Sequence, residues 1–164
     1  MFKITKRWTF DAAHQLHGLP DGHKCGRLHG HTYTVEIEVS AEDLDEHGFV
    51  VDFADLAPVK QLIDGLYDHR FLNDVLPASV NPTAEILASL IYAHVRMLYL
   101  LRGNTAGDDP MDLELVMPNS GPLIIHAVRP LRDGAEITAI RLSETGSSWA
   151  EYRDTTADRA VWGQ

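Results

Sequence analysis

The chain has 164 residues, of which 45% are hydrophobic and 23% are charged, so it suits one soluble globular domain with a buried core. Its net charge of −10 argues against nucleic acid as a general partner, because contacts with phosphate backbones need a basic surface. The single cysteine excludes an internal disulfide and favours a reducing compartment.

The first part of the chain predicts an antiparallel sheet. Residues 2–12 carry β-branched and aromatic side chains and predict a strand, and the polar stretch 15–24, with glycine and proline, predicts a loop. Residues 32–40 alternate between apolar and polar side chains, as in a strand whose two faces differ. After an acidic turn, residues 49–51 predict a short return strand.

Two helices are expected next. The first begins where Asp52 or Asp55 could cap it and runs to about Tyr67, with apolar residues at helical spacing. A loop follows. The second helix begins where Asn81 or Thr83 could cap it and also carries an apolar stripe.

The remaining chain predicts further strands. Two short apolar runs at 113–117 and 123–128 are separated by a turn-rich segment and predict an extra hairpin. A last strand is expected at 136–142, followed by a turn of small residues. We therefore expect one domain over residues 1–153 and a loose tail over residues 154–164.

No segment is expected to enter a membrane. Residues 1–8 lack the apolar run of a signal peptide. The most apolar helical stretch, residues 86–101, is interrupted by Ser89, His94 and Arg96. We therefore expect a cytoplasmic protein with no membrane partner.

Three histidines could form a metal site. If the strand at 32–40 extends back to His29, then His29 and His31 lie on one face, and Gly30 leaves room between them. His14, from a neighbouring strand, would complete a three-histidine site with one open position, which is the arrangement of catalytic zinc. The alternative is that these are ordinary histidines that happen to lie near one another.

Cys25 has three interpretations. It could be a fourth zinc ligand that closes the site, a catalytic base or nucleophile beside an open site, or an inert buried thiol. Its neighbours Lys24 and Arg27 argue against inertness, because cations favour the thiolate. We favour a reactive thiolate.

Two further groups could carry chemistry. Asp68 and His69 could form a proton-carrying pair, since a carboxylate fixes the tautomer of an imidazole. A carboxylate at the end of a helix followed by a surface histidine explains them equally well. Glu144 follows an apolar strand and could bind amine or amide N–H groups in a pocket, although alone it would be taken for a surface residue.

Several short motifs, in family order over most of residues 1–153, resemble the 6-pyruvoyltetrahydropterin synthase superfamily. They are FDAAH at 10–14, CGRLHGH at 25–31, DFADL at 52–56, DH at 68–69 with LND at 72–74, NPTAE at 81–85, and ET at 144–145 with SWAEY at 148–152. The three residues between Cys25 and His29 resemble the 6-carboxytetrahydropterin synthases of the queuosine pathway, since biopterin-pathway enzymes usually have a longer spacing. A folate-pathway relative typically carries glutamate in place of the cysteine.

The resemblance implies an α+β tunnelling fold, with a four-stranded antiparallel sheet and two helices on one face. The family usually connects the second helix to the last strand directly, so residues 103–134 are an insertion with hairpin-like strands. Family members form trimers whose sheets make a barrel, and two trimers usually stack into a hexamer. Their active sites lie at subunit interfaces, so one site can use residues of different subunits.

The resemblance also implies a zinc-dependent carbon–carbon lyase. This enzyme converts 7,8-dihydroneopterin triphosphate into 6-carboxy-5,6,7,8-tetrahydropterin, acetaldehyde and triphosphate in queuosine or deazapurine biosynthesis. Residues with expected roles are His14, His29 and His31 for zinc, Cys25 as the base, Asp68 and His69 as its proton relay, and Glu144 for the pterin ring. Proximity alone suggests His23, Lys24 and Arg27 for the triphosphate.

Two alternatives stay open. A 6-pyruvoyltetrahydropterin synthase would eliminate triphosphate without losing the two-carbon fragment. A catalytically silent family member would keep zinc and the fold, although it would have no need of Cys25, Asp68, His69 and Glu144 together.

Overall fold

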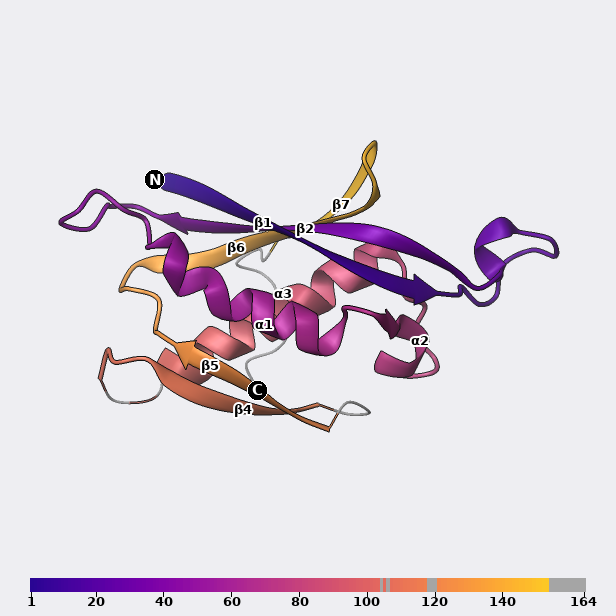
Figure 1. The fold of residues 1–164 in the computed structure, drawn as a ribbon. Coiled ribbons are helices and arrows are strands. Elements are labelled where there is room, and N and C mark those ends of the chain that lie inside the picture. Colours follow the sequence, from indigo (N-terminus) through magenta and orange to yellow (C-terminus); the bar gives the residue numbers. More distant parts are fainter. Residues whose placement is uncertain (104, 106, 118–120, 154–164) are drawn as a thin grey trace.

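The computed structural model describes residues 1–103, 105, 107–117 and 121–153 (Figure 1). Its main sheet has five strands in the order β3-β1-β2-β6-β7. β1 (Phe2–His14), β2 (His29–Ala41), β6 (Ala135–Thr145) and β7 (Ser148–Arg153) pair antiparallel, whereas β3 (Arg70–Phe71) runs parallel to the end of β1. The predicted four-stranded antiparallel sheet is therefore wrong by one strand. β3 has only two residues, too few to show any periodicity in the sequence.

The helices form a layer on one face of this sheet (Figure 1). α1 (Ala57–Leu66) follows a 3-10 turn, η2 (Phe53–Leu56), and the Asp52 side chain caps that turn by accepting from the Ala54 amide. α3 (Ala84–Gly103) packs against β6 and β7, and the Thr83 hydroxyl accepts from the Ile86 amide at its start. A short helix, α2 (Leu72–Val75), and β3 lie in the stretch where only a loop was predicted. The two predicted helices are confirmed.

The expected return strand at 49–51 is wrong. Val50 and Val51 form bends, Phe49 has no regular structure, and none of the three pairs with a strand among the described residues. Val50 and Val51 are buried and belong to the hydrophobic core. Their apolar character therefore reflects side-chain packing, which does not require a hydrogen-bonded ladder.

The core lies between the sheet and the helices. On β2 the apolar positions Tyr33, Val35, Ile37 and Val39 are all 0% exposed, as the alternation predicted. Among the described residues, α3 is the one helix long and apolar enough to cross a membrane by length and composition. Core helices of soluble proteins pass the same test, and the α3 stripe that includes Leu87, Ile91 and Val95 belongs to the core.

The predicted extra hairpin is present as a separate two-stranded sheet, β4 (Met111–Met117) and β5 (Gly121–Val128). Figure 1 shows α1 and α3 lying between the main sheet and this hairpin. A Cβ on Gly65 of α1 would lie 2.4 Å from Leu123, so the hairpin sits tightly on the helix. The buried Arg102 guanidinium donates to the carbonyl oxygens of Val128 and Gly107, which ties α3 to the hairpin and to the chain leading into it. The hairpin is an integral third layer.

The face of the sheet opposite the helices carries a charged network around Glu38. Its carboxylate accepts two hydrogen bonds from Arg153, at 2.7 and 3.1 Å, and one each from Lys3 at 3.0 Å and Thr138 at 2.9 Å. These contacts lower the pKa of Glu38 to about 2, with the Arg153 hydrogen bonds as the largest cause.

We expect Glu38→Gln to destabilise the protein near neutral pH and to reduce its acid sensitivity. Because the pKa is depressed in the folded state, the stabilisation is fully present above the ordinary value of 4.5 and is lost as the pH falls towards 2. The loss in the free energy of unfolding near neutral pH should be on the order of 1–3 kcal/mol. Urea unfolding at about pH 7 and about pH 3 measures it. The exposed Glu42→Gln is the control and should change neither value; a Glu38→Gln deficit that is equal at both pH values would contradict the expectation.

Candidate metal centre and active site

Three histidines converge where the β1–β2 pair ends. The strands pair His14 with His29, and strand alternation places His31 on the same face as His29. One ring nitrogen from each lies within 4.8 Å of the others, so the three residues could hold a metal ion. Gly30 has a different role from the one expected, because its missing side chain lies on the other face. A Cβ there would lie 3.2 Å from the Ala12 carbonyl oxygen of the paired strand.

The hydrogen bonds of the rings fix where their protons lie. His14 Nδ1 is 2.7 Å from the Pro82 carbonyl oxygen, and His29 Nδ1 is 2.7 Å from that of Arg27. A carbonyl can only accept, so both Nδ1 atoms carry the proton and both Nε2 atoms present lone pairs. These two Nε2 atoms lie 3.1 Å apart.

The third ring completes a site that fits a cation. His31 Nε2 is buried and has no hydrogen-bond partner among the described residues. Burial is the main reason that the pKa of His31 is lowered, so the neutral, ligating form is favoured. Lone pairs that face one another in a partly buried site repel unless a cation lies between them. Orientation of a ligand by a carbonyl is typical of metal-binding histidines. The residues present therefore fit a transition metal.

Glu144, near the end of β6, lies beside the histidines. Its two carboxylate oxygens are 3.9 Å from His14 Nε2 and 3.9 Å from His31 Nε2, beyond hydrogen-bond distance. The β2–β6 pairing, which joins Thr34 to Ser143, brings it there. Its side chain is 29% exposed, so a ligand could reach both the carboxylate and the histidines.

Tyr33 is a neighbour of the centre for which the sequence predicted only a place in the alternating strand at 32–40. It follows His29 and His31 on the same strand face, and its ring lies edge-on to His31 at 5.6 Å between centroids. Its hydroxyl is buried and unpaired among the described residues. The same alternation that grouped the histidines could have identified it.

The structure brings Asp68 and His69 together. Asp68 Oδ2 lies 3.0 Å from His69 Nδ1, and Asp68 Oδ1 accepts from the Asp11 amide at 2.9 Å. That backbone hydrogen bond is the main reason that the pKa of Asp68 is lowered, with His69 contributing. His69 has φ +56° and donates its amide to the Asp11 carbonyl. Its imidazole is 77% exposed and lines an open pocket of about 590 Å³ with Asp11 and Arg70.

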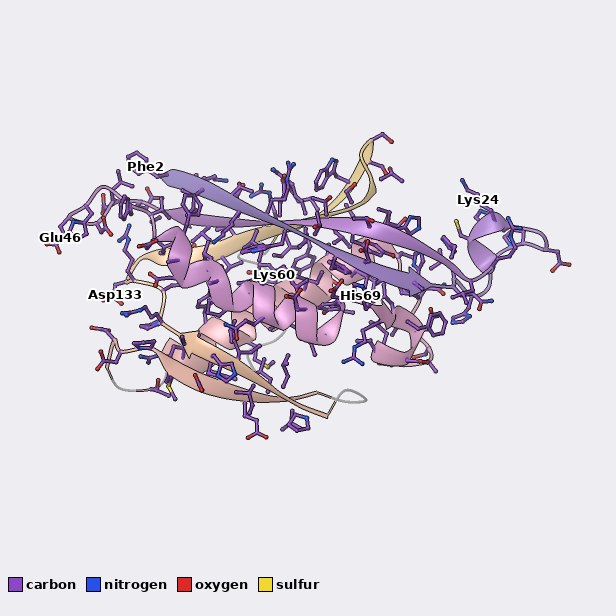
Figure 2. All side chains as sticks on the ribbon, in the orientation of Figure 1. Phe2, Lys24, Glu46, Lys60, His69 and Asp133 are labelled. Atoms are coloured by element: carbon purple, nitrogen blue, oxygen red, sulfur yellow. The ribbon has the colours of Figure 1, made fainter. Side chains whose placement is uncertain are left out.

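Cys25 lies elsewhere, on the 3-10 turn η1 (Lys24–Gly26) in the loop between β1 and β2. Figure 2 shows Lys24 on this turn, well away from His69. Within the described residues, the group that could hold a metal consists of the three histidines without Cys25, which argues against a fourth-ligand role. No hydrogen bond in the described part of the chain joins Cys25 to Asp68 or His69.

The residues suggested for the triphosphate are only partly grouped. His23 Nδ1 accepts from the Cys25 amide at 3.2 Å. His23 and Arg27 line a surface pocket of about 390 Å³ together with His17, whereas Lys24 does not line it.

The fold and the histidine cluster define an α+β protein with a candidate metal centre, and comparisons with known proteins give its family. The sequence profile described as 6-pyruvoyl tetrahydropterin synthase matches residues 3–108. The chain belongs to this family, which confirms the predicted family and the prediction of a lyase-type enzyme.

Individual relatives agree. A Haemophilus influenzae protein named 6-carboxy-5,6,7,8-tetrahydropterin synthase is 34% identical over 161 residues, which cover 94% of this chain and 100% of the relative. A Bacillus subtilis protein of the same name is 41% identical over 100 residues, covering 58% of this chain and 66% of the relative. The structure of the Caenorhabditis elegans 6-pyruvoyl tetrahydropterin synthase aligns with TM-score 0.64 at 21% identity, over 94% of this chain and 96% of that one. This last likeness concerns the fold alone.

Proposed function

We propose that the protein is a zinc-dependent 6-carboxy-5,6,7,8-tetrahydropterin synthase. It would convert 7,8-dihydroneopterin triphosphate and one water molecule into 6-carboxy-5,6,7,8-tetrahydropterin, acetaldehyde and triphosphate. The observation that carries the proposal is the set of three converging imidazoles beside Glu144, in a chain that aligns with the whole length of a relative bearing this name. We propose that residues 1–153 form its single domain and that the protein is cytoplasmic.

His14, His29 and His31 would hold the metal. Zinc is the proposed ion because imidazole suits it and a three-histidine set leaves one position open. Bound zinc would supply Lewis acidity to the hydroxyl groups of the substrate side chain. The Pro82 and Arg27 carbonyls hold His14 and His29 so that their Nε2 atoms would be free to bind the ion.

Cys25 would remove the proton from the side-chain carbon of the substrate, and Asp68 with His69 would tune the thiol and relay the proton. Asp68 is suited to this because it holds the His69 ring at 3.0 Å while the Asp11 amide fixes the carboxylate. No hydrogen bond among the described residues joins Cys25 to this pair within one chain. We therefore propose that they meet across a subunit interface in a homo-oligomer. As in other family members, this oligomer would be a hexamer built from two trimers.

Glu144 would fix the pterin ring. Its two oxygens can accept hydrogen bonds from two adjacent N–H groups, a pairing that a carboxylate matches well. Because these oxygens lie 3.9 Å from two of the histidines, the bound ring would lie beside the residues that would hold the metal. His23, Lys24 and Arg27 would supply local positive charge for the triphosphate in a protein of net charge −10.

The product distinguishes this proposal from its alternatives. Zinc-loaded protein is incubated with 7,8-dihydroneopterin triphosphate, and the products are identified by mass spectrometry. A 6-carboxytetrahydropterin product with acetaldehyde supports the proposal. A pyruvoyl product without acetaldehyde would instead identify a 6-pyruvoyltetrahydropterin synthase. Bound zinc without any turnover would point to a silent family member.

A further inference from the structure

Two asparagine side chains form hydrogen bonds with the backbone segment that follows β1. The β1–β3 ladder covers Ala12 and Ala13 and stops where β3 ends at Phe71. The backbone groups of Gln15 and His17 come next, and they pair with no strand among the described residues. Unpaired backbone donors and acceptors need partners from side chains or water.

Asn73 and Asn81, which we call the asparagine clamp, supply these partners. Asn73 Oδ1 accepts from the Gln15 amide at 2.9 Å, and its Nδ2 donates to the Gln15 carbonyl at 2.7 Å. In the same way, Asn81 Oδ1 accepts from the His17 amide at 2.6 Å, and its Nδ2 donates to the His17 carbonyl at 2.9 Å. A planar amide offers a donor and an acceptor together, as a peptide group does, whereas a carboxylate only accepts. This explains why asparagine stands at both positions.

The clamp holds the turn that carries Cys25. Leu16 lies between the two clamped residues, and its amide donates to the Cys25 carbonyl at 2.9 Å. The Gln15 side chain also donates to the Gly26 carbonyl at 2.8 Å. The position of η1 therefore depends on a backbone segment that Asn73 fixes at Gln15 and Asn81 fixes at His17.

The clamp also holds the metal centre. His14 directly precedes the clamped segment, and its Nδ1 donates to the carbonyl of Pro82, the residue after Asn81. Asn81 thus fixes the segment on which the orienting carbonyl of a buried histidine lies. An orienting group of this kind typically contributes a factor of about 10–100 to metal affinity.

We propose that Asn73 and Asn81 are positioning residues that hold the metal-ligating His14 and the Cys25 turn in one fixed relation. The proposal rests on the proposed function, because it takes the histidines as ligands and Cys25 as the base. It gives a physical role to the motifs at 72–74 and 81–85, which contribute no side chain to the proposed chemistry.

The test compares three variants of the full-length protein with the unmutated parent. The variants are Asn81→Asp, Asn81→Ala and Asn73→Ala. For the Asn81 variants we expect zinc affinity to fall about 10–100-fold, with a changed visible absorption spectrum of the cobalt-loaded protein. For Asn73→Ala we expect the rate at which Cys25 reacts with an aromatic disulfide reagent to change several-fold. Cys25 is the only cysteine of the chain, so this signal has one source.

Gln61→Ala is the matched control. The Gln61 amide spans the backbone of His126 in the same way, at 2.8 and 3.1 Å, but it joins α1 to the hairpin. Its loss should lower thermal stability and leave zinc affinity, the cobalt spectrum and the Cys25 rate unchanged. If the asparagine variants behave as Gln61→Ala does, the clamp is only structural and the proposal is overturned.

Two further measurements distinguish a failure of the clamp proposal from a failure of the proposed function. If the parent protein binds no zinc, the proposed function fails, and the Cys25 rate still decides whether the clamp holds η1. If the variants fail to fold, hydrogen exchange of the parent protein decides. The amides of Gln15 and His17 should be protected, and exchange as fast as in an open loop would overturn the proposal.

Discussion

Replacing His31 with alanine is expected to lower zinc affinity by more than about 100-fold. The loss should exceed the factor typical of a residue that only orients a ligand, because His31 would contribute a direct bond to the metal. His31 Nε2 is buried, has no hydrogen-bond partner in the part of the chain that the structure describes, and belongs to a cluster whose other two Nε2 atoms are 3.1 Å apart. Competition with a chromogenic chelator measures the affinity.

The same variant should lose stabilisation by zinc. An ion that binds the folded state alone adds about 2.7 kcal/mol to the free energy of unfolding at a concentration 100 times its Kd. Zinc should therefore raise the melting temperature of the parent protein and not that of His31→Ala, and a chelator should abolish the rise. His47→Ala, in an exposed loop, is the control and should keep full affinity. Full affinity in His31→Ala would place the metal elsewhere.

Much of this centre could be predicted because a strand has a simple geometry. A period of two residues is enough to place His29 and His31 on one face, and β1–β2 pairing then aligns His14 with His29. The two helices and the hairpin were also predictable, since each has an apolar pattern long enough to read. Their positions around the sheet follow from burying those apolar faces.

What failed was decided by contacts between distant segments. β3 exists because Arg70 and Phe71 meet the end of β1, and nothing in two residues signals this. Val50 and Val51 are buried in the core. Apolar residues are expected both in a buried strand and in a buried bend, so their sequence could not distinguish the two. The contacts of the Pro82 and Arg27 carbonyls with the histidines could not be predicted for a different reason. Every residue has a backbone carbonyl, so no sequence motif shows which one will orient a histidine.

Cys25→Ala is expected to lower turnover by about 10²–10⁴-fold, the usual contribution of a positioned acid or base, while zinc affinity stays unchanged. The reason is that Cys25 stands outside the group of residues that could hold the metal, on a separate turn. Steady-state kinetics and the chelator assay measure the two quantities on the same sample. A loss of zinc affinity would restore the fourth-ligand interpretation, and unchanged turnover would move the base to another residue.

A mixing experiment then tests where the base meets its relay. Cys25→Ala and His69→Ala proteins, each inactive alone, are unfolded together and reassembled into mixed oligomers. If a site combines Cys25 of one subunit with Asp68 and His69 of another, about a quarter of randomly formed sites contain both intact groups, and that share of activity returns. If one subunit supplied all three groups, no mixed site would be intact and no activity would return. Recovery would therefore explain why Asp68 and His69 pair closely within the chain while Cys25 lies on the separate turn η1.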